Sequence, residues 1–173
     1  MRTDNIVLVG FMGTGKTTVG RLVAGRLGMS FVDMDQAIEE RAGRKISEIF
    51  AAEGEPYFRE LERDAVKELS AKAGLVIATG GGVVLNHDNI SDFSRSGTVV
   101  CLIADPRVIL DRVSNESHRP LLEGGEKARK ILTLLESRRK LYDSIPNRID
   151  TTSITPAQVA EKVLVLARPG PAR

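Results

Sequence analysis

The strongest chemical signal in the sequence is a glycine-rich loop that ends in a lysine and a threonine. Residues 10–17 read GFMGTGKT and fit the pattern G-x-x-x-x-G-K-[ST] without a mismatch. The loop follows an apolar run, 6–9, and opens a helical stretch, so its backbone N–H groups and the start of the helix can face a phosphate. Lys16 would reach the β- and γ-phosphates of a nucleoside triphosphate, and the Thr17 hydroxyl would bind Mg²⁺. A plain glycine-rich turn is the alternative. The residues expected to contact the nucleotide are Gly13, Thr14, Gly15, Lys16, Thr17 and Thr18.

Two carboxylates, Asp33 and Asp35, stand where a second short strand, 30–33, should end. Ligands of parallel α/β sheets gather at the carboxyl ends of the strands, so both side chains could face the phosphate loop. One could hold Mg²⁺ through water, and the other could orient and deprotonate an acceptor hydroxyl. The alternative is structural, because Asp33 followed by Gln36 also fits a helix cap.

Two arginines are candidates for binding an anionic acceptor. Arg59 precedes Glu62 by three residues on a predicted helix, which allows either a surface ion pair or a guanidinium group held in place for a ligand. Arg138 and Arg139 lie on the helix predicted over 126–142. At about 100° per residue, Arg138 falls nearer the middle of the apolar stripe of that helix. A charge on the inward face needs a partner, which a bound carboxylate would supply.

Three glycines, Gly80, Gly81 and Gly82, follow the third apolar run, 75–78. A motor ATPase would place an Asp after such a strand, whereas glycines permit close approach of the backbone to a ligand. A tight turn is the alternative. A GTPase would also need a guanine-reading Asn/Thr-Lys-x-Asp stretch, which the sequence lacks. These absences favour a small kinase over the other two classes.

A small kinase must shield the transferring phosphoryl group from water and neutralise its charge. The polar stretch 114–125 has the composition of a lid and carries Arg119, and Arg112 precedes it at the end of a helix. Alone, Arg119 would be an ordinary solvated side chain. Taken together, the residues predict a small kinase for an anionic, hydroxylated acceptor.

The elements that position these residues alternate along the chain. Strands are predicted at 6–9, 30–33, 75–78, 98–103 and 148–150. Helices are predicted at 16–27, 36–41, 46–72 with a break at Gly54, from Pro106 onward, 126–142 and 156–167. This alternation predicts one α/β domain over residues 1–173, with parallel strands and helices on both faces of the sheet. The Pro/Gly-rich end, 168–173, is predicted to be a flexible tail.

Composition excludes several other classes of protein. The 25 Lys and Arg residues nearly balance the 23 Asp and Glu residues, which argues against a protein that coats nucleic acid or an anionic membrane. Apolar residues make up 42% of the chain, enough for a core. No run approaches a membrane span, and the N-terminus lacks a secretory signal. The single cysteine, Cys101, excludes an intramolecular disulfide and fits a reducing compartment, so a cytoplasmic location is expected.

The order and spacing of these residues resemble the shikimate kinase family over nearly the whole chain. The shared motifs are residues 12–20 (MGTGKTTVG), 33–35 (DMD), Gly43, Ile46, 48–50 (EIF), 54–59 (GEPYFR), Glu62, 80–82 (GGG), 119–122 (RPLL), Arg138, 141–142 (LY) and 150–151 (DT). The resemblance implies a three-layer P-loop fold like that of nucleoside-monophosphate kinases, with a five-stranded parallel sheet in the order 2-3-1-4-5. It also implies transfer of the ATP γ-phosphoryl group to the 3-hydroxyl of shikimate with Mg²⁺, a step toward chorismate and aromatic amino acids.

The resemblance further implies roles for individual residues. Lys16 would contact the phosphates, Thr17 would bind Mg²⁺, and Asp33 would assist the metal through water. Asp35 would bind the shikimate hydroxyls and act as the base, and Arg119 would contact the transferring group from a lid over about 112–125. Arg59 and Arg138 would bind the shikimate carboxylate. The backbone of Gly80, Gly81 and Gly82 would line the acceptor pocket, and Arg112 would stack on adenine. The acceptor would sit against a helical region over about 33–62. A complete site within one chain would suit a monomer.

The sequence departs from the family pattern at two places, and two alternatives remain open. After 141–142 the chain continues DSIP, which predicts an altered helix end, and the loop 150–156 lacks a basic residue that some members place near adenine. A gluconate or nucleoside-monophosphate kinase of the same fold is one alternative. The other is a nucleotide-binding module without catalysis, which is disfavoured because Asp35 and Arg119 are both present.

Overall fold

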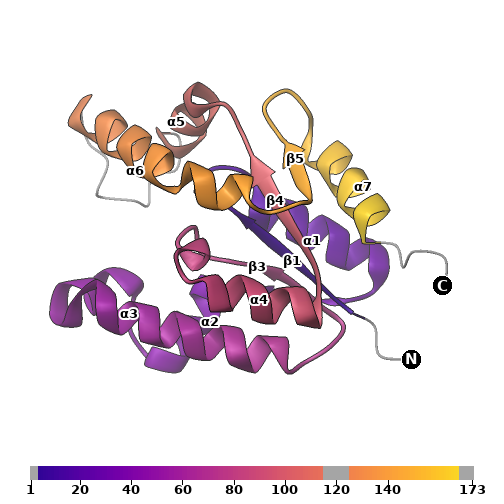
Figure 1. Ribbon diagram of the computed structural model, residues 1–173, viewed down its shortest axis with the longest axis horizontal. Helices are drawn as coiled ribbons and strands as arrows, with labels where there is room; N and C mark the ends of the chain where they lie inside the picture. The colour runs from indigo at the N-terminus through magenta and orange to yellow at the C-terminus, as the bar shows by residue number, and fades with distance from the viewer. Residues whose placement is uncertain (1–3, 115–124, 168–173) are drawn as a thin grey trace.

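A computed structural model describes residues 4–114 and 125–167 of the chain. Its centre is a sheet of five parallel strands in the order β2-β3-β1-β4-β5 (Figure 1). The strands are β1 (Asn5–Gly10), β2 (Ser30–Asp33), β3 (Leu75–Ala78), β4 (Gly97–Ile103) and β5 (Arg148–Asp150). This order confirms the fold that the resemblance implied. Arg119, most of the predicted lid and the tail 168–173 lie outside the described residues.

Helices cover both faces of the sheet, as predicted. They are α1 (Lys16–Leu27), α2 (Met34–Ala42), α3 (Ile46–Ser70), α4 (His87–Ser96), α5 (Pro106–Ser114), α6 (Gly125–Asp143) and α7 (Pro156–Leu166), with a short 3₁₀ helix η1 (Val83–Leu85) after β3. Figure 1 shows α5 and α6 at the top of the view and α2, α3 and α4 at the bottom. None of the helices in the described ranges is both long and apolar enough to cross a membrane.

Alternation along β1 divides the core into two parts. Ile6 and Leu8 pack toward α1 and α7, whereas Val7 and Val9 pack into the larger cluster beneath α2 to α6. All four side chains are buried. Because β1 is buried on both faces, its sequence is continuously apolar rather than alternating, as is typical of a central parallel strand.

The helix α4 is absent from the elements predicted by sequence. It crosses over between β3 and β4, strands that flank β1 on opposite sides. Its N-cap is Asn86, whose side chain accepts from the backbone N–H of Asp88, and it buries Asn89 and Phe93. Only two of its residues are buried, so the apolar periodicity was too short to reveal it. The requirement for a long crossover between parallel strands was the available signal.

A kink divides α3 at the position predicted by sequence. Gly54 has φ 79° and ψ 178°, outside the helical region and in a range that glycine adopts without steric cost. Pro56 follows at the start of the second segment, where a missing N–H does little harm. The kink therefore sets the direction of the segment that carries Arg59 and Glu62.

Two glycines of α1 allow a direct test of the packing. A Cβ at Gly20 would lie 2.6 Å from Cε2 of Phe31, whereas a Cβ at Gly25 would meet nothing within 4 Å. We expect Gly25→Ala to raise the free energy of unfolding by about 0.5–1 kcal/mol, because alanine favours the helix. Gly20→Ala should lower it by about 1 kcal/mol, because Phe31 must move. Urea denaturation followed by circular dichroism measures both, and a gain from both substitutions would contradict this packing.

Candidate active site

A cavity of about 1020 Å³ lies at the carboxyl ends of β1, β2 and β3. Such an edge is where parallel α/β sheets bind ligands, because the loops that leave neighbouring strands converge there. The cavity is lined by every site residue predicted from the sequence that falls within the described ranges: Gly13, Thr14, Gly15, Lys16, Thr17, Thr18, Asp33, Asp35, Arg59, Gly80, Gly81, Gly82, Arg112 and Arg138. Residues up to 125 positions apart in sequence thus share one cavity.

The phosphate loop has the backbone conformation that its glycines predict. Gly13 and Gly15 adopt φ values of 75° and 94°, and Gly15 caps α1. The buried hydroxyl of Thr14 donates to the carbonyl of Phe11 at 2.8 Å. Lys16 Nζ donates to the Gly10 and Phe11 carbonyls, each at 2.9 Å. These bonds hold the ammonium group over the concave side of the loop, where a phosphate would sit.

Asp33 caps a helix, which is the structural alternative considered for it from the sequence, and it also contacts the phosphate loop. Its Oδ1 accepts from the backbone N–H of Gln36 at 3.3 Å and caps α2, which begins at Met34 rather than at Gln36. Its Oδ2 accepts from the Thr17 hydroxyl at 2.8 Å. A hydroxyl and a carboxylate oxygen are thereby paired at the edge of the phosphate loop.

Arg112 ties the phosphate loop to the loop after β5. Its Nη1 donates to the Gly13 carbonyl at 3.1 Å and to the Thr151 hydroxyl at 3.1 Å, and its Nη2 donates to the Thr151 carbonyl at 2.8 Å. The Thr151 hydroxyl in turn lies within hydrogen-bond distance of the carbonyl oxygens of Thr14 and Ile103, to which it can donate. The sequence motif contained Thr151 but gave no indication that it contacts the phosphate loop.

On the other side of the cavity, two glycines make room for charged side chains. A Cβ on Gly80 would lie 2.7 Å from Asp35 Oδ1, and a Cβ on Gly82 would lie 2.3 Å from Arg59 Nη1. Neither glycine has a positive φ. Close approach of charged side chains, rather than a left-handed backbone conformation, therefore distinguishes these two glycines.

Glu62 is a buried carboxylate between Arg59 and Asp35. It accepts from Arg59 Nη1 at 2.9 Å, and its side chain is only 1% exposed. Burial raises the pKa of the Glu62 carboxyl, the charge of Arg59 opposes that rise, and the charge of Asp35 adds to it. The ion pair is therefore not the solvated surface pair considered as an alternative, and it fixes Arg59 at the cavity wall.

Arg138 faces the cavity and Arg139 faces solvent, as the apolar stripe predicted. Arg139 has a side chain 69% exposed, whereas Nε of Arg138 is buried and, among the described residues, has no hydrogen-bond partner. Tyr142, one turn further, donates its hydroxyl to the Gly81 carbonyl at 2.6 Å. Burial raises the pKa of Tyr142 to about 12, so this hydroxyl stays protonated and ties α6 to the glycine turn.

Sequence reasoning assigned no role to several apolar residues that line the same cavity. The rings of Phe50 and Phe58 pack in a tilted arrangement with their centroids 4.9 Å apart, and Ile46 and Leu134 also line the cavity. Ile154 and Pro156 line the cavity on the side of Arg112. The positions of Ile46, Phe50 and Phe58 within the shared motifs were the signal available for them.

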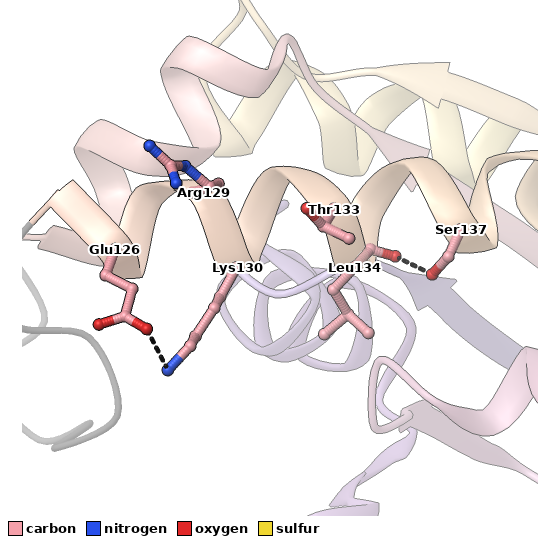
Figure 2. A pocket seen from close by; sticks show the side chains of 6 residues that line it. All are labelled: Glu126, Arg129, Lys130, Thr133, Leu134 and Ser137. Atoms are coloured by element: carbon pink, nitrogen blue, oxygen red, sulfur yellow. Dashed lines mark hydrogen bonds and ion pairs between the residues drawn. The ribbon is translucent and has the colours of Figure 1, made fainter.

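A smaller depression of about 360 Å³ runs along one face of α6 (Figure 2). It is lined by Glu126, Arg129, Lys130, Thr133, Leu134 and Ser137, and Glu126 pairs with Lys130 across one helical turn. All six residues belong to a single helix and only Leu134 also lines the large cavity. The depression therefore borders the candidate active site without converging side chains of its own.

The fold and the site together define a P-loop kinase that acts on a small anionic acceptor. The family model for shikimate kinase matches residues 12–167. The chain is 47% identical over 160 residues to shikimate kinase of Thermodesulfovibrio yellowstonii, covering 92% of each, and 45% identical to that of Pelotomaculum thermopropionicum, covering 92% of this chain and 93% of the relative. The chain belongs to the shikimate kinase family. It is therefore a kinase with ATP as co-substrate, as the resemblance implied.

Solved structures agree with this assignment. A shikimate kinase from Acinetobacter baumannii in complex with shikimate superposes with a TM-score of 0.87 at 39% identity, over 95% of this chain and 92% of that one. Shikimate kinase from Aquifex aeolicus gives 0.81 at 36% identity, over 93% and 94%. A gluconokinase from Sinorhizobium meliloti gives 0.57 at 15% identity, over 94% and 90%, which shows a shared fold alone.

The contacts of Arg112 predict a measurable effect on nucleotide binding. Arg112→Ala should weaken ATP binding at least tenfold, because it removes the charged donor that joins the Gly13 and Thr151 carbonyls and leaves both without that partner. Titration calorimetry with ATP measures the change. Arg107→Ala, which removes an exposed arginine from the same helix, is the matched control. Equal ATP affinity in the wild type and Arg112→Ala would contradict the role of this bridge.

Proposed function

We propose that the chain transfers the γ-phosphoryl group of ATP to the 3-hydroxyl of shikimate. The observation that carries the proposal is that one cavity joins the phosphate loop to a carboxylate base candidate, Asp35, and two arginines, Arg59 and Arg138. A donor nucleotide on the loop and an anionic hydroxy acid on the arginines would meet within it. The identity of the acceptor rests on family membership and on the relative whose structure holds shikimate.

In the nucleotide half, the phosphate loop would hold the triphosphate and Arg112 would lie against the adenine. Lys16 would turn from the loop carbonyls to the β- and γ-phosphates and stabilise charge there. Thr17 and Asp33 fit Mg²⁺, because the pair offers one hydroxyl and one carboxylate oxygen beside the phosphates, and Mg²⁺ takes its other ligands from phosphate and water. When bound, Mg²⁺ would neutralise phosphate charge during transfer.

In the acceptor half, Arg59 and Arg138 would bind the carboxylate of shikimate. The buried Nε of Arg138 is a donor that such a carboxylate would satisfy. Gly80, Gly81 and Gly82 would line the acceptor through their backbone, and Asp35 would accept hydrogen bonds from its hydroxyls. These contacts fix the acceptor at both ends, so that one hydroxyl points at the phosphate loop.

The chemical step follows from this placement. Asp35 would take the proton of the 3-hydroxyl of shikimate as the hydroxyl oxygen attacks the γ-phosphorus. The bond between the γ-phosphorus and the oxygen that bridges to the β-phosphate would break, and ADP would be released. Lys16 would stabilise the charge on the phosphoryl oxygens. We assign the same task to Arg119, which lies outside the described residues, within the proposed lid over about 112–125. The site residues all belong to one chain, so we propose a monomer, and we propose the cytoplasm as its location because ATP is supplied there.

The acceptor is tested by ADP release with Mg²⁺ and ATP, comparing shikimate with quinate, gluconate and nucleoside monophosphates. We expect turnover with shikimate well above the background without acceptor. Turnover with another acceptor but not with shikimate would contradict the assignment of the two arginines to the shikimate carboxylate. Nucleotide binding without turnover on any acceptor would favour a module that only binds nucleotide.

The proposed base leads to a separate prediction. Asp35→Asn should lower kcat about 100-fold or more, because an amide cannot accept the hydroxyl proton. ATP affinity should stay within twofold, since Asp35 lies on the acceptor side of the cavity. A coupled ADP-release assay and nucleotide titration measure the two effects. A turnover of Asp35→Asn near that of the wild type would contradict the role of Asp35 as the base.

The two adjacent arginines of α6 provide a matched pair. Arg138→Ala should raise the KM for shikimate about tenfold or more and leave the KM for ATP nearly unchanged, because it removes a charge-assisted contact to the carboxylate. Arg139→Ala removes the same charge from the solvent side and should change neither KM. Equal losses for both substrates in Arg138→Ala would point to misfolding instead.

A further inference from the structure

The guanidinium group of Arg59 is already engaged on several sides. Glu62 accepts from Nη1 at 2.9 Å, and Glu55 Oε1 accepts from Nε at 3.1 Å and from Nη2 at 2.9 Å. The guanidinium carbon lies 5.2 Å from the ring centroid of Phe58, and the Gly82 backbone approaches so closely that a Cβ there would clash with the group. Three of the five N–H donors of an arginine are thus in use.

The two carboxylates on Arg59 differ in their surroundings. The side chain of Glu62 is 1% exposed and that of Glu55 is 54% exposed, although both line the cavity. Glu62 is held between Arg59 and Asp35 and is almost completely buried. Glu55 directly follows the kink at Gly54 and faces solvent, so rotation of its side chain exchanges the contact with Arg59 for hydration at little cost.

We propose that Glu55 is an internal substitute for the carboxylate of the acceptor, and that the acceptor displaces it from Arg59. This inference rests on the proposed function, in which Arg59 binds that carboxylate. The Nε and Nη2 atoms form the side of a guanidinium group that binds a carboxylate through two parallel hydrogen bonds. Glu55 occupies that side, so a ligand that uses it must replace Glu55 there.

Charge in the acceptor half supports displacement over simultaneous binding. Asp35, Glu55 and Glu62 oppose Arg59 and Arg138 there, three acidic groups against two basic ones. A further carboxylate would enter against this excess while Glu55 remains in place. Exchange of Glu55 for the ligand preserves both the charge balance and the hydrogen bonds of Arg59. Glu55 therefore sets the affinity for carboxylate acceptors by competing with them.

A supporting role for Glu55 would have the opposite consequence. If Glu55 oriented Arg59 for the ligand, its loss would weaken acceptor binding. However, Glu62, Phe58 and the Gly82 backbone already fix the guanidinium group, whose side chain is only 24% exposed. Removal of Glu55 should consequently free a binding edge without releasing the arginine, and the sign of the change in affinity separates the two roles.

The test compares Glu55→Gln with Glu60→Gln, which removes the same charge from an exposed position of α3 outside the cavity. Glu55→Gln should lower both the Kd and the KM for shikimate about two- to fivefold, the range expected for loss of one exposed ion pair. The KM for ATP should stay unchanged, and Glu60→Gln should match the wild type. Glu55→Ala should shift shikimate affinity in the same direction.

Each other result overturns the inference. Weaker shikimate binding in Glu55→Gln would make Glu55 a supporting residue for Arg59, and equal binding would show no competition. An equal gain in shikimate affinity in Glu60→Gln would show that the effect comes from the net charge of the protein and not from the contact of Glu55 with Arg59. Thermal unfolding of each variant reports whether it is folded. A wild type that does not phosphorylate shikimate would refute the proposed function itself, an outcome distinct from all of these.

Discussion

The parallel alignment of β1, β2 and β3 is the constraint on which the site depends. Parallel strands end at the same edge, so the loops after Gly10, Asp33 and Ala78 must leave side by side. That edge brings the phosphate loop, the carboxylate pair and the glycine turn together although they are far apart in sequence. Each loop then needs only local chemistry to present its groups. The larger core cluster, beneath α2 to α6, supports the acceptor side of the cavity.

Space at this edge is as important as charge. Gly80 and Gly82 provide positions at which Asp35 and Arg59 approach the backbone more closely than any Cβ would allow. The glycines thereby leave room for two charged groups on other elements. The same principle operates at Gly20, where α1 approaches Phe31 on β2. Because dense protein interiors leave little room for adjustment, close packing of this kind fixes the site relative to the sheet.

Burial separates the acidic residues of the cavity by function. Glu62 is enclosed and fixes Arg59, Asp33 joins the Thr17 hydroxyl to the start of α2, and Glu55 remains at the solvent boundary. Carboxylates of similar intrinsic chemistry are thus a structural anchor, a link to the phosphate loop and an exchangeable partner. Their surroundings decide how firmly each holds its cation, since an exposed ion pair is weak and a buried one is difficult to break.

The sequence by itself determined the strands and the phosphate loop, because periodicity and glycine–lysine spacing express local backbone requirements. The residues it proposed for the site, within the described ranges, line one cavity. It also placed Arg138 inward and Arg139 outward, since helical geometry fixes their relative angle. It did not reveal α4, the bridge from Arg112 to Thr151, or the contact of Glu55 with the edge of Arg59 beside Gly82. Those features depend on which surfaces meet when the helices pack onto the sheet. Only the tertiary structure decides that, because distances between residues remote in sequence are set by packing rather than by local conformation.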